Sequence, residues 1–246
     1  MALNPIAPVT DYQSMLNRIF WFTFAAALGA VYLLRSNVLS LDAALERIDF
    51  DLEAGSGNVL PIPGGYLFPA LAVGLLARVF RIHGHIAHLL GIRERFEIDV
   101  ILAALARESG VAVEDISDEE WIARRHDIMR QAFYRFASSK SPEIDAHLVH
   151  QALDSWSWFW IGLESTLVFV LTGLVLISMS VYSIGGLIIA GVLLLAFVGL
   201  PLIRYQCKRF AIAQVKAIVS DQGRAAIVRE AFNCLPPVGK ALNRAA

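Results

Sequence analysis

Long runs of apolar residues divide this 246-residue chain into blocks. Three runs contain no charged residue: 19–34, 60–77 and 165–203. A helix needs about 20 apolar residues to cross the hydrocarbon core of a bilayer. The first two runs are close to that length, and the third is about twice as long. The pattern therefore predicts membrane-spanning helices rather than the amphipathic elements of a soluble core.

Proline, glycine and serine refine the boundaries of these spans. The second run opens with LPIPGG, and because these residues resist a regular helix, we expect the helix to begin near Tyr66. SVYSIGG lies near the middle of the third run, and Ser183, Gly185 and Gly186 predict a tight turn between two spans. The predicted fold class is all-α: a polytopic membrane protein with long cytoplasmic helical extensions and four transmembrane helices, at 19–34, 66–80, 156–180 and 184–203.

The distribution of lysine and arginine predicts the orientation of the spans. Segment 35–65 is acidic, whereas 81–155 and the tail 204–246 carry most of the basic residues, several of them close to a span. Basic segments beside spans stay on the cytoplasmic side. We therefore expect a protein of the cell's inner membrane with an external loop at 35–65 and both termini in the cytoplasm, including the short segment 1–18.

The segments outside the spans also carry helical patterns. In the external loop, Ser40 is a predicted N-cap for a short amphipathic helix, whose apolar stripe comprises Leu41, Leu45, Ile48 and Leu52. In segment 81–155, Ser117 and Glu120 have the spacing of a capping box. Further on, Ser141 and Pro142 predict the start of a helix that continues unbroken through the third span to about Ser180.

Composition and charge exclude several classes of function. Hydrophobic residues make up 57% of the chain and charged residues 17%, against about half and a quarter in soluble domains. The net charge of −1 gives no basis for a nucleic-acid partner. Cys207 and Cys234 have no CxxC spacing, so neither a disulfide framework nor a zinc site is predicted. We predict no cofactor.

Two groups of histidines are candidates for metal binding. Glu143, His147, His150 and Asp154 recur at helical spacing, which can present imidazoles and carboxylates to one ion. The favoured alternative is a solvated polar face or a subunit contact, since the opposite face is apolar. In the second group, His83, His85 and His88, the first two point to different sides of a helix, so no site is predicted there.

Aromatic and basic residues are expected to contact lipid headgroups at the inner leaflet. Trp156, Trp158 and Trp160 precede the third span as an aromatic belt. Near the end of the fourth span lie four cations that suit anionic lipid: Arg204, Lys208, Arg209 and Lys216.

Glu164 lies about one turn deeper in the third span than the last of these tryptophans. Because a charge in lipid is costly, such a residue usually faces the interior of a bundle or a partner. By the threading above, Arg78 and Arg18 lie at a similar depth. We therefore predict an intramembrane charge pair of Glu164 with Arg78 or, failing that, with Arg18. The alternative is a glutamate that extends to the headgroups.

Small residues spaced four apart predict close helix packing on several spans. They occur as the pairs Ala25/Gly29, Ala26/Ala30, Ala70/Gly74 and Gly186/Ala190. Packing within one bundle and packing between subunits explain them equally well. We expect a homo-oligomer.

These patterns favour a non-enzymatic multi-pass subunit, a helical bundle that acts as a pore, a gate or a membrane anchor or sensor for a cytosolic protein partner. Channel-like effectors and sensors of bacterial defence systems, and parts of secretion machinery, share this architecture by analogy. One alternative is a membrane-embedded metal-dependent enzyme that acts on lipid. Another is a small-solute transporter, for which LPIPGG is the one hint of a broken helix.

Overall fold

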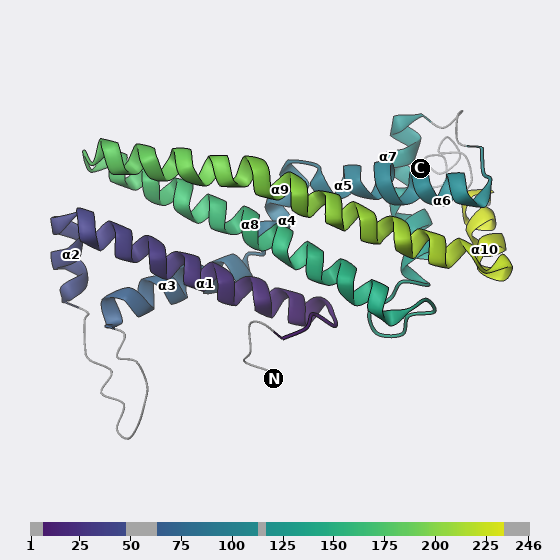
Figure 1. Ribbon diagram of the computed structural model, residues 1–246, viewed down its shortest axis with the longest axis horizontal. Helices are drawn as coiled ribbons and strands as arrows, with labels where there is room; N and C mark the ends of the chain where they lie inside the picture. Colours follow the sequence, from purple (N-terminus) through teal and green to yellow (C-terminus); the bar gives the residue numbers. More distant parts are fainter. Residues whose placement is uncertain (1–6, 48–62, 113–116, 234–246) are drawn as a thin grey trace, which may run out of the picture. The chain divides into compact units, whose positions relative to one another are not determined.

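The computed structural model describes residues 7–47, 63–112 and 117–233, and within these ranges the chain is helical and contains no strand (Figure 1). The helices group into two compact units. Unit 1 comprises Met1–Ala7, Gln13–Gly84 and Trp156–Arg204. Unit 2 comprises Pro8–Tyr12, His85–Ser155 and Tyr205–Ala246.

Unit 1 contains the apolar helices. They are α1 (Tyr12–Asn37), α2 (Leu39–Glu46), α3 (Gly64–Val79) and most of α8 (Ala146–Ser178), together with the first part of α9 (Tyr182–Val219). Three of them, α1, α8 and α9, are long and apolar enough to cross a membrane. A fourth candidate is the pair formed by α3 and α4 (Ile82–Leu89), which passes the same test jointly but is bent by 53°. The structure thus fits a helical membrane protein.

α3 begins at Gly64, slightly earlier than the predicted start at Tyr66. Pro63 adopts an extended backbone just before the helix, and its carbonyl accepts hydrogen bonds from the amides of Tyr66 and Leu67. Proline has no backbone N–H to donate. No helical hydrogen bond is lost at this position, because the first amides of a helix have no intrahelical acceptor. Similarly, α2 follows Val38 rather than the expected cap Ser40, and the predicted stripe residues Ile48 and Leu52 lie outside the described residues.

The turn between α8 and α9 lies at residues 179–181, before the predicted Ser183–Gly186 turn. Ser180 has a left-handed backbone (φ 65°), and the amides of Ser180 and Val181 donate to the carbonyls of Ile177 and Leu176. This pattern is a Schellman motif, which ends a helix by satisfying its last carbonyls. A serine fills the position that usually holds glycine, so the sequence pattern pointed to the wrong residues.

Gly185 instead allows α9 to approach α8 closely. A Cβ on Gly185 would lie 2.6 Å from the carbonyl oxygen of Gly173, and one on Gly173 would lie 2.8 Å from that of Gly185. The two backbones therefore touch where both residues lack a side chain. A Cβ on Gly186, by contrast, would meet no atom of another described helix within 4 Å, and Ala190 is exposed.

Other small residues also mark close contacts inside unit 1. A Cβ on Gly74 of α3 would lie 3.2 Å from the ring of Phe20 on α1, and Ala70 is fully buried. Gly29 of α1 faces Phe169 of α8, where a Cβ would have a contact at 3.5 Å. Packing within one chain thus uses Gly29, Ala70 and Gly74 of the predicted pairs, whereas Ala25 is exposed.

Unit 2 is a set of shorter helices with an apolar core. They are α5 (Ile92–Phe96), α6 (Ala103–Ser109), α7 (Asp118–Ile128), α10 (Gln222–Asn233) and two π-helical segments, η1 (Glu97–Leu102) and η2 (Met129–Tyr134). The fully buried core side chains include Leu102, Leu105, Met129, Phe136, Ile218 and Val228. The predicted cap of α7 is confirmed, since Ser117 Oγ accepts from the amide of Glu120 at 3.3 Å. α8, however, begins at Ala146 rather than near Pro142.

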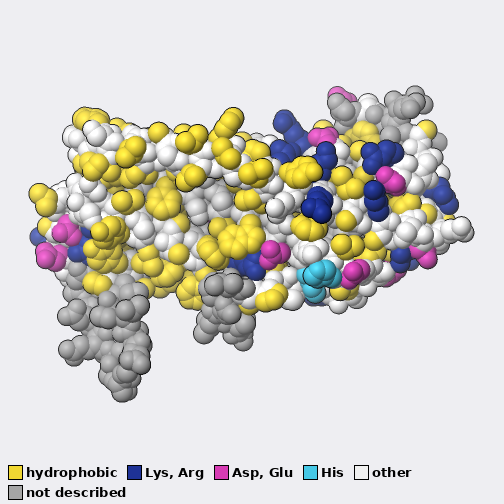
Figure 2. All heavy atoms as spheres, viewed as in Figure 1, with side chains coloured by type: hydrophobic (Ala, Val, Ile, Leu, Met, Phe, Trp, Pro, Cys, Tyr) yellow, Lys and Arg dark blue, Asp and Glu magenta, His cyan; other side chains and the backbone are white. Residues whose placement is uncertain are grey.

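The two units expose different kinds of side chain (Figure 2). On the face shown, hydrophobic side chains cover the part of α9 that belongs to unit 1, and charged side chains concentrate over unit 2. In the most apolar 18-residue window of α9, no residue is buried. Phe197 is 81% exposed and Leu195 73%. A surface of this kind is more apolar than is usual for soluble proteins and is compatible with lipid.

Candidate functional site

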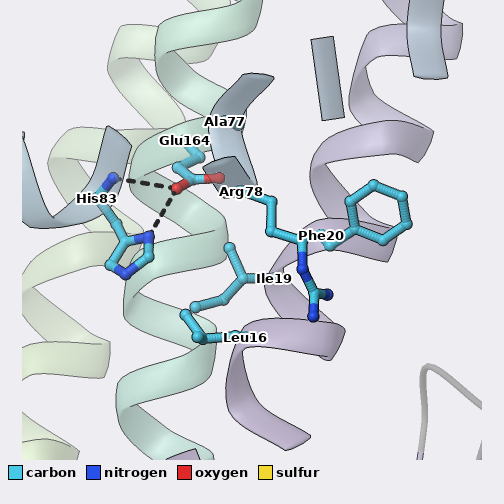
Figure 3. Close-up of a pocket in the computed structure, with 7 residues that line it drawn as sticks. All are labelled: Leu16, Ile19, Phe20, Ala77, Arg78, His83 and Glu164. Atoms are coloured by element: carbon cyan, nitrogen blue, oxygen red, sulfur yellow. Dashed lines mark hydrogen bonds and ion pairs between the residues drawn. The ribbon is translucent and has the colours of Figure 1, made fainter. Parts of the chain in front are cut away.

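The carboxylate of Glu164 lies inside unit 1, where 2% of the residue is exposed. Both of its oxygens are hydrogen-bonded. The hydroxyl of Thr23 on α1 donates to Oε2 at 2.6 Å. On the other side, Oε1 lies 3.2 Å from both the backbone nitrogen and Nδ1 of His83 on α4 (Figure 3). One side chain of α8 thus binds two other helices.

The break between α3 and α4 explains why His83 reaches this carboxylate. Arg81 has a left-handed backbone (φ 47°), which ends α3 and redirects the chain into α4. His83 is the second residue of α4, so its amide has no acceptor within its own helix. Glu164 supplies the acceptor from α8, and its negative charge suits the positive end of the α4 dipole.

The two arginines predicted to pair with Glu164 have other hydrogen-bond partners. Arg78 and Glu164 line one small cavity, but the guanidinium of Arg78 points away from the carboxylate (Figure 3). Nη1 of Arg78 donates to Asn17 Oδ1 at 2.6 Å. Arg18 is buried and donates to Ser157 Oγ at 3.0 Å and to the carbonyl of Ala7 at 2.7 Å.

Among the contacts of the described residues, therefore, Glu164 forms no ion pair with Arg78 or Arg18. The helix break places the amide of His83 at the carboxylate, and Asn17 on α1 holds the arginine that was expected there. The alternative prediction, a glutamate extended to the headgroups, does not match a carboxylate that is buried and bonded on both oxygens.

A small cavity lies beside the Glu164 carboxylate. Its volume is about 10 Å³, close to the room that one water molecule needs. The cavity is lined by Leu16, Ile19, Phe20, Ala77, Arg78, His83 and Glu164. A water in this position would have polar neighbours on one side and an apolar wall on the other.

A second buried carboxylate lies in unit 2. Glu97, which begins η1, is 3% exposed. Its Oε1 accepts from Arg93 Nε at 2.7 Å and from the hydroxyl of Tyr134, the last residue of η2, at 2.8 Å. Arg125 Nε lies 3.3 Å from Oε2. Two π-helical segments are thus joined through one carboxylate.

The surroundings of Glu97 also change the acidity of its neighbours. Burial of the Tyr134 hydroxyl, followed by the negative charge of Glu97, raises the pKa of Tyr134 to about 12. The pKa of Arg93 is raised as well: its own burial acts to lower it, but Tyr134 and Glu97 outweigh that effect. Sequence patterns did not single out this cluster, because its members lie on separate helices and none belongs to a recognised motif.

The predicted metal ligands do not converge. Glu143 precedes α8 and so is not on the helical face that carries the other candidates. His147 Nε2 lies 2.9 Å from Gln151 Nε2. Within the described residues, no three His, Cys, Asp or Glu side chains are placed to hold a metal ion. In the second group His83 is buried whereas His85 and His88 are exposed, so the first two diverge as the sequence predicted.

The candidates for headgroup contact fall into two classes. The four cations of α9, Arg204, Lys208, Arg209 and Lys216, are all exposed. Of the tryptophans, Trp158 is 40% exposed, whereas Trp160 is buried with its ring 5.9 Å from that of His83. Trp156 stacks on Trp160 at 5.8 Å. The predicted belt is therefore divided between the surface and the interior of unit 1.

The model of the YmfE protein family matches residues 11–234. The chain belongs to the YmfE protein family. The region shared with the family includes the helices that carry Thr23, His83, Glu164 and Glu97. No curated protein and no solved structure matches the chain. The family's name carries no activity, so the function has to be argued from the sites themselves.

Proposed function

We propose that the protein is a non-enzymatic, multi-pass subunit of the inner membrane that anchors a cytoplasmic helical unit for a soluble protein partner. The observation that carries this proposal is the change of surroundings along α9. Its first part exposes a highly apolar surface, and its last part buries Cys207, Val215 and Ile218 in the core of unit 2. One helix therefore suits lipid at its start and a water-soluble core at its end.

Four spans and cytoplasmic termini form part of the proposal. α1, α8 and α9 supply three spans, and the bent pair of α3 and α4 supplies the fourth. An even number of spans places both termini on one side, and the basic residues of 81–155 and 204–246 favour the cytoplasm. The exposed cations Arg204, Lys208, Arg209 and Lys216 would then contact anionic lipid.

We also propose that the chain self-associates through α9. The Gly186/Ala190 pair faces away from the rest of its own chain, so this face of α9 is free to meet a second copy. The cavity beside Glu164 holds about one water, so an ion pathway would have to form between copies. We therefore favour an anchor or sensor over a pore that lies within one chain.

The topology is tested by labelling single cysteines in intact cells with a membrane-impermeant maleimide. Leu39, 87% exposed, is expected outside, and Lys140, also exposed, inside. Leu39→Cys should label in intact cells, and Lys140→Cys only after permeabilisation. Labelling of Lys140→Cys in intact cells would overturn the proposed topology.

The anchoring role is tested by photocrosslinking in cells. A photoreactive residue at Arg130, whose side chain is 74% exposed in unit 2, should crosslink a cytosolic protein. The matched control is the same residue at Phe197, which should crosslink lipid or another copy of the chain. Reconstituted liposomes should retain a small dye. Dye release would favour the pore, and a cytosolic crosslink from Phe197 would contradict the membrane assignment of α9.

A further inference from the structure

We propose that Arg78 binds the phosphate of one lipid headgroup, at the end of α3 that the proposed topology places on the cytoplasmic side. The site lies within unit 1, where Arg78 belongs to the last turn of α3 and is partly exposed. The inference rests on the membrane assignment above, and it adds a specific ligand at a position away from the cations of α9. The ligand is a phosphate group that carries acyl chains.

The positive charge of Arg78 has no carboxylate partner among the described residues. Its Nη1 donates to a neutral amide oxygen, Asn17 Oδ1, at 2.6 Å, and its guanidinium lies 5.8 Å from the centre of the Phe20 ring. Glu164 lines the same cavity, but Figure 3 shows the guanidinium directed away from it. A charge at membrane depth is costly unless an opposite charge balances it. The arrangement therefore favours an anion supplied by the surroundings.

The guanidinium presents one edge to such an anion. A guanidinium has five N–H donors in a rigid fork, and the contact with Asn17 uses Nη1. No described residue accepts a hydrogen bond from Nε or Nη2, which share the other edge of the group. Two parallel N–H donors match two oxygens of a phosphate, and such bidentate pairs are strong. Asn17 and Phe20 hold the guanidinium from α1, so this edge is positioned before a ligand binds.

The surface around Arg78 favours a phosphate carried by a lipid over one in solution. Leu75 lies one turn deeper on the same face of α3 and is 45% exposed. Its neighbours Leu76 and Val79 are 54% and 70% exposed, and apolar side chains of this kind suit acyl chains. An arginine near the end of a span keeps its stem in apolar surroundings and extends its charge to the headgroups. The cytoplasmic leaflet, where α3 ends in the proposed topology, carries the anionic lipids.

Lipid binding can be measured by native mass spectrometry of the purified full chain in detergent, titrated with phosphatidylglycerol. The unsubstituted chain should bind the first phosphatidylglycerol more tightly than later ones. Arg78→Gln removes the charge and the fork, so it should weaken this first binding by about tenfold. Arg81 is exposed and still attracts anionic lipid, so binding should not vanish. Arg47→Gln, the same change at an exposed arginine of unit 1, should leave the affinity unchanged.

Asn17→Asp distinguishes a binding site from a purely structural contact. The substitution keeps the size of the side chain and places a carboxylate where Arg78 Nη1 already lies at 2.6 Å, so Arg78 gains a counter-charge within the chain. We expect the affinity for phosphatidylglycerol to fall about as far as in Arg78→Gln, with no loss of thermal stability. If the contact were purely structural, the lipid affinity of Asn17→Asp would stay unchanged.

Inorganic phosphate distinguishes a lipid site from a site for free anions. Added phosphate should not displace the first phosphatidylglycerol, because it has no acyl chains to contact Leu75. Displacement by phosphate would overturn the assignment to lipid. Equal affinities of Arg78→Gln and the unsubstituted chain would overturn the site itself. Should Arg78→Gln fail to fold, an unchanged affinity in Asn17→Asp would overturn it equally.

The two proposals fail independently. Labelling at Leu39 and Lys140 reports the topology whether or not a lipid is bound at Arg78. The expected labelling together with an unchanged lipid affinity in Arg78→Gln would refute the lipid site and leave the membrane subunit standing. Weaker lipid binding in Arg78→Gln together with labelling of Lys140→Cys in intact cells would refute the topology alone.

Discussion

Glu97 and Glu164 are buried to nearly the same extent, 3% and 2% exposed, yet they are held by different kinds of group. Glu97 lies against the guanidinium groups of Arg93 and Arg125, so its negative charge has fixed partners. Glu164 is held by a hydroxyl, an amide and an imidazole, and the two arginines nearby are bound elsewhere. Burial alone therefore does not tell how the negative charge of a carboxylate is balanced by its neighbours.

The largest effect should follow from charge reversal at Glu164. Glu164→Arg would place a buried cation against two donors, the Thr23 hydroxyl and the His83 amide, and we expect a loss of at least about 3–5 kcal/mol of stability. Because Arg78 is bound to Asn17, the added change Arg78→Glu should give no rescue. Thermal melting in detergent measures both variants, and Glu143→Arg, at an exposed position, should stay within about 0.5 kcal/mol. Rescue by the double change would restore the ion pair predicted from sequence.

Removal of Glu97 should be the next most damaging change. Glu97→Ala leaves Arg125, whose side chain is 22% exposed, with Glu94 at 3.5 Å as its remaining carboxylate, whereas Arg93 is 64% exposed and can turn to solvent. We expect a cost of about 2–4 kcal/mol and faster hydrogen exchange in η1 and η2. Glu94→Ala removes the more exposed neighbour, 3.5 Å from Arg125, and should cost about 0.5–1 kcal/mol. Equal costs for the two variants would contradict the structural role of Glu97.

Replacement of each buried glutamate by glutamine, which removes the charge but keeps the size, should destabilise the two sites to different extents. Glu164→Gln keeps an acceptor for His83 and an amide for Thr23, so its cost at neutral pH should be about 1 kcal/mol. Glu97→Gln removes the charge that two arginines share, so it should cost clearly more. Both are measured by thermal melting under identical conditions. A larger loss of stability in Glu164→Gln than in Glu97→Gln would contradict this expectation.

The smallest effect should be seen with Tyr134→Phe, measured at high pH. The pKa of Tyr134 is raised to about 12 from the ordinary value of 10.0. A raised pKa in the folded state contributes stability that is fully present below pH 10 and is lost as the pH rises through about 12. The variant should therefore lack this part of the alkaline destabilisation. Identical melting curves for the two proteins between pH 10 and 12 would show that the hydroxyl is not coupled to Glu97.

Local patterns predicted the helices well where a single signal governs the structure. The apolar runs match α1, α8 and α9, the helices that are long and apolar enough to cross a membrane, because lack of charge over a long stretch is a local property of the sequence. The N-cap Ser117 was found because capping depends on residues close in sequence. The turn after α8 was misplaced because the glycines that suggested it serve a contact with another helix, which local sequence does not reveal.

The site was only partly predictable for the same reason. A glutamate within a span is conspicuous, so Glu164 was recognised and its burial could be expected. Its partners were not, because Thr23 is an ordinary residue in an apolar run and His83 acts through its backbone amide as well as its ring. Which helix ends face which side chains is set by the tertiary arrangement. Glu97 escaped notice because it becomes buried only when η1, η2 and α7 pack together.

The short turn between α8 and α9 has a consequence for how the protein is made. As the ribosome delivers the chain, α9 follows α8 after only residues 179–181, and the Gly173–Gly185 backbone contact can form as soon as both helices have emerged. We expect the two helices to leave the translocation channel as one hairpin rather than as successive segments. A bulky residue at Gly173 should then act during biosynthesis, reducing the amount of inserted chain before any mature protein exists to be destabilised.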